Sequence, residues 1–146
     1  MVGKTAPIRP NDRERMETIR FHCGCLACLL MGHLDRHTTI EHVTQTGRRV
    51  GGKEQHQNTI GLCGWHHFGH VDPGVLTDTM RPAFGPSLMD GRHVFEEHFG
   101  DEVDVLIPAQ NYILELFAEN PWPEYNLPRD VARKTRTRWI ELKHET

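Results

Sequence analysis

The sequence predicts an α+β fold in which two short strands and a following helix form a small zinc-stabilised core, with further helices around it. Residues 38–43 (TTIEHV) are rich in β-branched side chains, and residues 58–62 (NTIGL) can form a second, antiparallel strand. A helix is expected to begin at Cys63 or Gly64 and to stop at residues 72–74, Asp-Pro-Gly. The expected core is therefore strand, strand, helix.

Helices are also expected on both sides of this core. A short helix is expected over residues 11–21, and another over residues 90–99, where apolar side chains form one stripe. Residues 103–117 repeat a helical pattern that Pro108 should split. The Pro- and Gly-rich residues 71–91 are expected to form an extended loop.

The length of 146 residues suits one domain with an appended tail. We expect a disordered N-terminus over residues 1–10, a domain over residues 11–120 with its core at about 25–71, and a basic C-terminal tail over residues 121–146. Only 37% of the residues are hydrophobic, and the mean hydropathy is −0.57. A metal centre would help so modest a core to fold.

No apolar run is long enough to span a bilayer, and the first residues lack the apolar segment of a secretory signal. We therefore expect a soluble cytoplasmic protein that does not associate with a membrane. In that compartment four unevenly spaced cysteines favour metal binding over disulfides.

The net charge of −3 argues against a simple nucleic-acid coat protein, but the basic residues are clustered. We predict that the two clusters contact DNA phosphates, although ordinary solvated faces explain either cluster alone equally well. The first cluster is a Gly-rich loop with Arg48, Arg49 and Lys53, and the second is the tail with Arg133, Lys134, Arg136 and Arg138. Trp139 can stack on a base or pack on the domain.

Two close pairs of ligands predict a structural zinc site. Cys25 and Cys28 form a C-x2-C pair, and Cys63 and His66 form a second pair with the same spacing. A tight turn at this spacing can aim both side chains at one ion. Cys23 is a rival ligand, and the less favoured competitors are His22, His33 and His37.

A second, open set of residues fits phosphodiester hydrolysis, which needs an activated water and a divalent cation. His42 at the end of a strand can act as general base, and Glu41 can supply an oxygen ligand to Mg²⁺ or Mn²⁺. His67 and His70, three residues apart on the expected helix, can bind the same ion. The Asn58 amide can orient His42 or approach the metal.

Glu41-His42, Asn58 and the CxxHH stretch that begins at Cys63 together resemble the HNH (ββα-metal) endonuclease motif. The resemblance implies that His42 is the general base, that Asn58 is the middle residue and that His67 is a metal ligand. Glu41 falls where the family usually has an acidic or imidazole ligand. The four predicted zinc ligands match the pairs that many members carry around the motif.

A narrower resemblance extends from about Cys25 to Leu106. The runs TIGLCGWHHFGH and GPSLMDGRHVFEEHFGDEVDVL are similar to the phage Ref-type recombination-enhancement nucleases. That resemblance implies DNA cleavage with a divalent metal and the help of a RecA-type recombinase filament, in a phage or its bacterial host.

Two other functions remain open at this stage. A non-catalytic zinc-binding module that binds DNA would need only the Cys/His pairs and the basic clusters. A structural zinc protein of a phage assembly or packaging complex would have no affinity for DNA. The sequence does not give the oligomeric state or the preferred DNA substrate.

Overall fold

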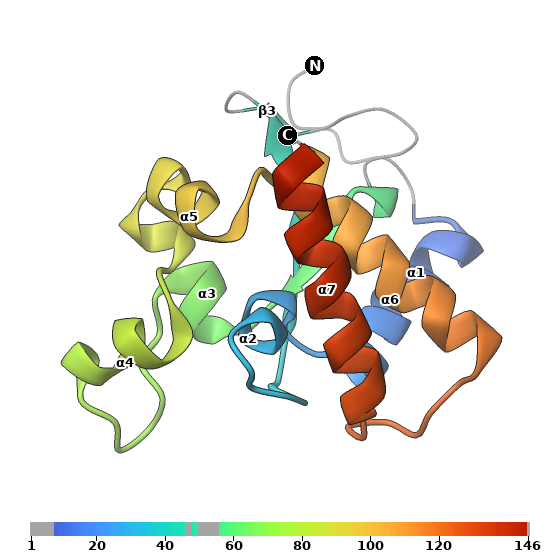
Figure 1. Ribbon diagram of the computed structural model, residues 1–146, viewed down its shortest axis with the longest axis horizontal. Helices are drawn as coiled ribbons and strands as arrows, with labels where there is room; N and C mark the ends of the chain where they lie inside the picture. Colours follow the sequence, from blue (N-terminus) through green and yellow to red (C-terminus); the bar gives the residue numbers. More distant parts are fainter. Residues whose placement is uncertain (1–7, 46–47, 50–55, 146) are drawn as a thin grey trace.

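The computed structural model describes residues 8–45, 48–49 and 56–145 (Figure 1). Disorder was predicted over residues 1–10; residues 1–7 lie outside the described residues, and Pro10 already begins a helix. The predicted DNA contact of Lys53 also lies outside the described residues. The fold belongs to the α+β class, with helices as its main component and a two-stranded sheet at its centre.

The central sheet pairs β1 (Thr39–His42) with β4 (Thr59–Leu62) in antiparallel register, so that Glu41 lies opposite Ile60 and His42 opposite Thr59. A second antiparallel pair follows β1 at once. It joins β2 (Thr44–Gln45) to β3 (Arg48–Arg49), and β3 lies in the Gly-rich segment expected to be a loop.

Helix α3 (Gly64–Phe68) follows β4 directly. It ends earlier than predicted, because Gly69 has a φ of 75°. Side chains with a Cβ rarely adopt this conformation, so a glycine there stops the helix. The order β1, β4, α3 places Glu41, His42 and His67 in one small unit.

The expected extended loop over residues 71–91 contains helix α4 (Thr77–Phe84) and the short η3 (Leu88–Asp90). That prediction was wrong because Pro82 and the nearby glycines were taken to exclude a helix. Met80 is completely buried, and the burial of this side chain offsets the backbone hydrogen bond lost at Pro82.

Residues 103–117 divide as expected, into η4 (Glu102–Leu106) and α6 (Ile107–Glu119). Pro108 lies in the first turn of α6, where a backbone N–H has no helical partner in any case. Helix α5 (Arg92–Phe99) precedes η4 and ends at Gly100.

The N-terminal part of the domain forms α1 (Pro10–Thr18), η1 (Ile19–Cys23) and α2 (Leu26–Leu30), and η1 and α2 contact β4. The tail forms α7 (Arg129–Glu145). In Figure 1, α7 runs between α2 and α6, and it contacts both. Trp139 of α7 donates its indole N–H to the Phe99 carbonyl at 2.6 Å, so this tryptophan docks on the domain.

Among the described helices, none combines the length with the apolar character that crossing a membrane requires.

Candidate functional site

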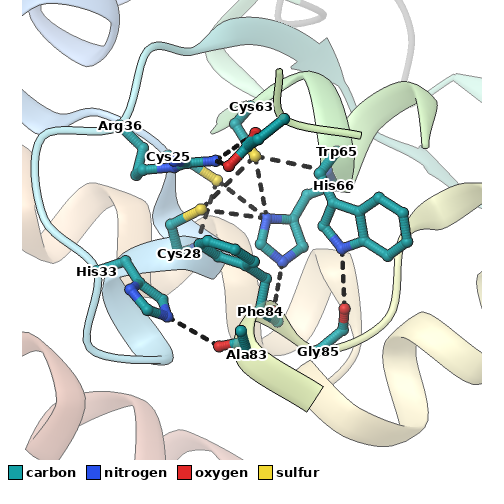
Figure 2. A network of polar contacts seen from close by, with 11 residues as sticks. Cys25, Cys28, His33, Arg36, Cys63, Trp65, His66, Ala83, Phe84 and Gly85 are labelled. Carbon is teal, nitrogen blue, oxygen red and sulfur yellow. Dashed lines mark hydrogen bonds and ion pairs between the residues drawn. The ribbon is translucent and has the colours of Figure 1, made fainter. Parts of the chain in front are cut away.

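Four side chains from the starts of two helices converge on one point and form a closed cage (Figure 2). Cys25 and Cys28 come from the start of α2, and Cys63 and His66 from the start of α3. The three sulfurs lie 3.3–3.4 Å from Nδ1 of His66, and the sulfurs of Cys28 and Cys63 are 3.6 Å apart. A zinc tetrahedron with metal–sulfur bonds of about 2.3 Å has edges of about 3.8 Å, so the cluster has the size of a zinc site.

The protonation of the cage residues also fits a metal. Nε2 of His66 donates a hydrogen bond to the Phe84 carbonyl at 2.7 Å, which leaves the lone pair on Nδ1 facing the sulfurs. Burial, and then the neighbouring thiols, raise the pKa of Cys25 well above its ordinary value. A bound cation would hold such thiols as thiolates, and three sulfurs with one imidazole are ligands that zinc accepts.

The cationic side chain of Arg36 lies next to the cage (Figure 2). The Arg36 guanidinium pairs with Asp72 at 2.6 and 2.8 Å and lies 4.6 Å from the centre of the Phe84 ring. Burial alone would lower the pKa of Arg36, but Asp72 and Cys28 raise it above its ordinary value. A Cys3His zinc site carries a net negative charge, which this arginine partly balances.

The remaining candidate ligands stay outside the cage. Among the described residues the four cage ligands form the only cluster of three or more candidate metal-binding side chains, which excludes Cys23. Cys23 is buried, and burial raises the pKa of its thiol to about 12. His22 contacts the Trp122 carbonyl at 2.9 Å, and His33 contacts the Ala83 carbonyl at 2.8 Å.

A contact between two side chains also joins β1 to α3. Oε2 of Glu41 and Nε2 of His67 lie 2.5 Å apart, and their side chains are 13% and 16% exposed. The Thr39 hydroxyl donates to the Leu62 carbonyl, so it accepts from Nδ1–H of His67 at 2.7 Å. In the contact with Glu41, Nε2–H donates to the carboxylate, as in an ion pair. A divalent cation that displaced this proton would meet an oxygen from β1 and a nitrogen from α3.

The residue after Glu41 has a partner that the sequence did not reveal. Nε2 of His42 lies 2.9 Å from Nδ1 of His56, and their rings meet edge to face. His56 is buried, with only 2% of its surface exposed. The backbone N–H of Val43 donates to the Asn58 carbonyl at 3.0 Å, which fastens the end of β1 beside this pair.

Among the described residues, His70 forms no cluster of three candidate metal ligands with Glu41 and His67. Its i, i+3 spacing from His67 would align the two on a helix, but α3 ends at Phe68, and Gly69 turns the chain. The His70 ring lies near Gly64 and lines a cavity of about 490 Å³ together with Arg36.

The basic residues predicted to contact DNA lie on two separate elements. Arg48 and Arg49 form β3. On α7, Arg133 and Lys134 pair with Asp130, and Arg138 pairs with Glu141 and Glu145. Arg136 donates to the Leu29 carbonyl at 3.5 Å.

The model of one protein family matches residues 9–114, a span that includes the cage, the Glu41–His67 contact and the His42–His56 pair. The family is described as "Recombination enhancement, RecA-dependent nuclease". The chain belongs to this family. Membership implies a nuclease role in recombination, with DNA as the bound molecule and RecA as the protein on which activity depends. No curated protein and no solved structure matches the chain.

The family span ends within α6 and does not include α7. All candidate residues on β1, β4 and α3 fall inside the span, whereas the basic residues of α7 fall outside it. Family membership therefore supports a function for the cage and for the Glu41–His67 contact. The predicted DNA contacts of α7 rest on the charge of that helix alone.

Proposed function

We propose that the protein is a metal-dependent DNA endonuclease of the HNH (ββα-metal) type that hydrolyses phosphodiester bonds during recombination. The contact between Glu41 and His67 carries this proposal, because it brings an oxygen and a nitrogen ligand from β1 and α3 to one partly open position next to His42. Membership in a nuclease family supports the same conclusion.

In this proposal Glu41 and His67 hold Mg²⁺ or Mn²⁺, which neutralises charge at the phosphate when bound. Thr39 orients the His67 ring by accepting its Nδ1–H. His70 was predicted as a further ligand, but we leave it out because its ring lies near Gly64.

His42 is the general base that takes a proton from the attacking water. When Nε2–H of His42 donates to Nδ1 of His56, the lone pair of His42 lies on Nδ1 and can accept that proton. His56 then holds the base in one tautomer, as the orienting partner of a catalytic imidazole does. Asn58 supports the base by fixing the backbone at Val43.

Zinc at Cys25, Cys28, Cys63 and His66 has a structural role in this scheme. The cage ties the start of α3 to α2, and His66 is followed directly by His67. Fixing one imidazole in the cage therefore fixes the backbone that presents the other to the catalytic cation.

We further propose that DNA lies along two basic elements. One is β3 with Arg48 and Arg49. Lys53, which is predicted from the sequence to contact DNA with them, lies outside the described residues. The other is the set of basic side chains on α7, namely Arg133, Lys134, Arg136 and Arg138. Arginine and lysine contacts to phosphates position DNA without reading its sequence.

The decisive test is cleavage of supercoiled plasmid and of single-stranded circles by wild type, His42→Ala and His93→Ala. Each protein is assayed with Mg²⁺ or Mn²⁺ or with a chelator, and with or without a RecA filament. His93 is a matched control because its side chain is 94% exposed on α5. We expect cleavage by wild type and by His93→Ala, and a loss of about 10²-fold or more in His42→Ala.

Full activity of His42→Ala would reject His42 as the base. If wild type binds DNA but never cuts it, even with the filament, the protein is a non-catalytic zinc-binding DNA module instead.

A further inference from the structure

One phenylalanine at the proposed nuclease site is exposed to solvent. All six phenylalanines of the chain lie within the described residues, and Phe68 is the exposed one, at 46%. Phe95 and Phe99, by contrast, are fully buried in the core. A phenyl ring left in solvent gives up the stabilisation that its burial would contribute, so core packing does not explain Phe68.

The ring of Phe68 is stacked on a residue that the proposed mechanism uses. Its centroid lies 3.8 Å from that of the His67 imidazole, and the two ring planes differ by only 16°. The same imidazole contacts the Glu41 carboxylate. Phe68 is therefore in direct contact with the side chain that would hold the catalytic cation.

A second exposed ring lies across the turn at Gly69. Phe68 is the last residue of α3, and Gly69, with a φ of 75°, turns the chain. The His70 ring then lies 5.4 Å from the Phe68 ring and is tilted by 33°. His70 is exposed as well, and it lines the cavity of about 490 Å³. Phe68 thus lies between the proposed cation site and the residue that borders this cavity.

A nucleobase fits this arrangement. Every base has a flat aromatic face, and stacking on exposed aromatic side chains is a general way in which proteins hold unpaired bases. DNA is the molecule that membership in a nuclease family implies. A base next to the phosphate that meets the cation lies within one nucleotide of it, so it can reach a ring that touches His67.

We propose that Phe68 stacks on an unpaired base next to the phosphate that is cut, with His70 beside it at the edge of the cavity. The inference rests on the proposed nuclease function and deepens it, because it makes Phe68 a residue that binds the substrate. Stacking does not read which base is present. The site is therefore selective for an unpaired base rather than for a sequence.

The test measures binding separately from cleavage. Phe68→Leu, Phe68→Trp and the control Leu76→Ala are each made in a His42→Ala background, so that bound DNA is not cut. Leu76 is a suitable control because it is a large apolar side chain that is 75% exposed. The probes are an oligothymidine strand with isolated 2-aminopurines, whose fluorescence falls on stacking, and its fully paired duplex. Affinity, quenching, zinc content and thermal unfolding are measured on each protein.

We expect Phe68→Leu to bind the single strand about 5- to 150-fold more weakly than the background protein, which corresponds to the loss of one stacked base. This variant should also lose the quenching of 2-aminopurine. Phe68→Trp should keep both the affinity and the quenching, because it keeps an aromatic face. The affinity for the duplex should not change in either variant. Zinc content and melting temperature should be preserved, since leucine still packs against His67.

Cleavage of the single strand and the duplex is then measured at saturating DNA, with Mg²⁺ and a RecA filament, in proteins that retain His42. A slower rate in Phe68→Leu with unchanged affinity and quenching would mean that Phe68 only packs on His67, which overturns the stacking role and leaves the proposed function intact. Equal affinities of Phe68→Leu and Leu76→Ala for the single strand would also overturn it. Binding that depends on Phe68 in a wild-type protein that never cuts would overturn the proposed function and leave Phe68 as a DNA-binding residue.

Discussion

Two neighbouring residues of α3, His66 and His67, belong to sites of opposite character. The His66 cage is buried, its four candidate ligand atoms lie within 4.8 Å of one another, and the second nitrogen of His66 donates to a backbone carbonyl. The proposed cation site at His67 has two protein side chains, Glu41 and His67 itself, and both are partly exposed. A cage that is filled by protein ligands can only hold a fold together, whereas an open site keeps positions for water and substrate.

The largest effect is expected from breaking the cage. Cys63→Ser should lose the bound zinc and unfold at ordinary temperatures, because zinc binding contributes on the order of 10 kcal/mol to such small metal-stabilised folds. Metal analysis and circular dichroism measure both losses. Cys23→Ala is the matched control: Cys23 is equally buried but lies outside the cage, so this variant should keep its zinc and lose about 1 kcal/mol of stability. A folded, zinc-loaded Cys63→Ser protein would contradict the structural role.

Replacing each histidine of α3 separately by alanine tests whether the two sites are independent. His66→Ala should behave as a cage mutant, with weakened zinc binding and a much lower melting temperature. His67→Ala should keep its zinc and its melting temperature within a few degrees, yet cut DNA about 10²-fold more slowly. Equal effects of the two substitutions on stability would mean that the two sites are not separate.

Chelation should also distinguish the two sites. A moderate concentration of EDTA should stop cleavage while the circular dichroism spectrum stays unchanged, and excess Mg²⁺ or Mn²⁺ should restore activity. The reason is that two protein ligands and several waters hold a cation far less tightly than four protein ligands do. Loss of the folded spectrum at the same EDTA concentration that stops cleavage would refute this difference.

A smaller effect is expected at the arginine that braces the cage. Arg36→Ala should weaken zinc binding about 10- to 100-fold, as losses in the surroundings of metal ligands generally do. Competition with a zinc-binding dye measures this affinity. Arg36→Lys should lose less because it keeps the positive charge. An unchanged affinity in Arg36→Ala would show that the cage does not need the balancing charge.

The smallest effect is expected at the exposed basic residues of α7. Replacing Arg133 and Lys134 by Ala should weaken DNA binding several-fold and lower the salt slope of log K by up to about 2. Arg20→Ala, an exposed arginine on η1, is the control for nonspecific charge loss. Point substitutions are preferred over truncation because α7 buries Ala132 and Leu142 against the domain. A salt slope identical to that of wild type would remove α7 from the DNA path.

Local patterns in the sequence were sufficient to predict the cage and the order of the core elements. The two x2 spacings act within single turns, so Cys25 with Cys28, and Cys63 with His66, are paired by backbone geometry alone. The β-branched runs similarly led to β1 and β4. The exclusion of Cys23 from the cage required the structure, because Cys23 and Cys25 are as close in sequence as the true pairs.

Contacts between distant segments could not be predicted in this way. His56 becomes the partner of His42 only when β1 and β4 pair, and Met80 of α4 is buried in the hydrophobic core. Arg92 and Glu102 meet across the end of α5, at a spacing that no helical period favours. The sequence by itself thus determined which Cys and His side chains pair within single turns. The tertiary structure decided which imidazole contacts His42 and where the buried charges lie, because these depend on burial and on packing between elements.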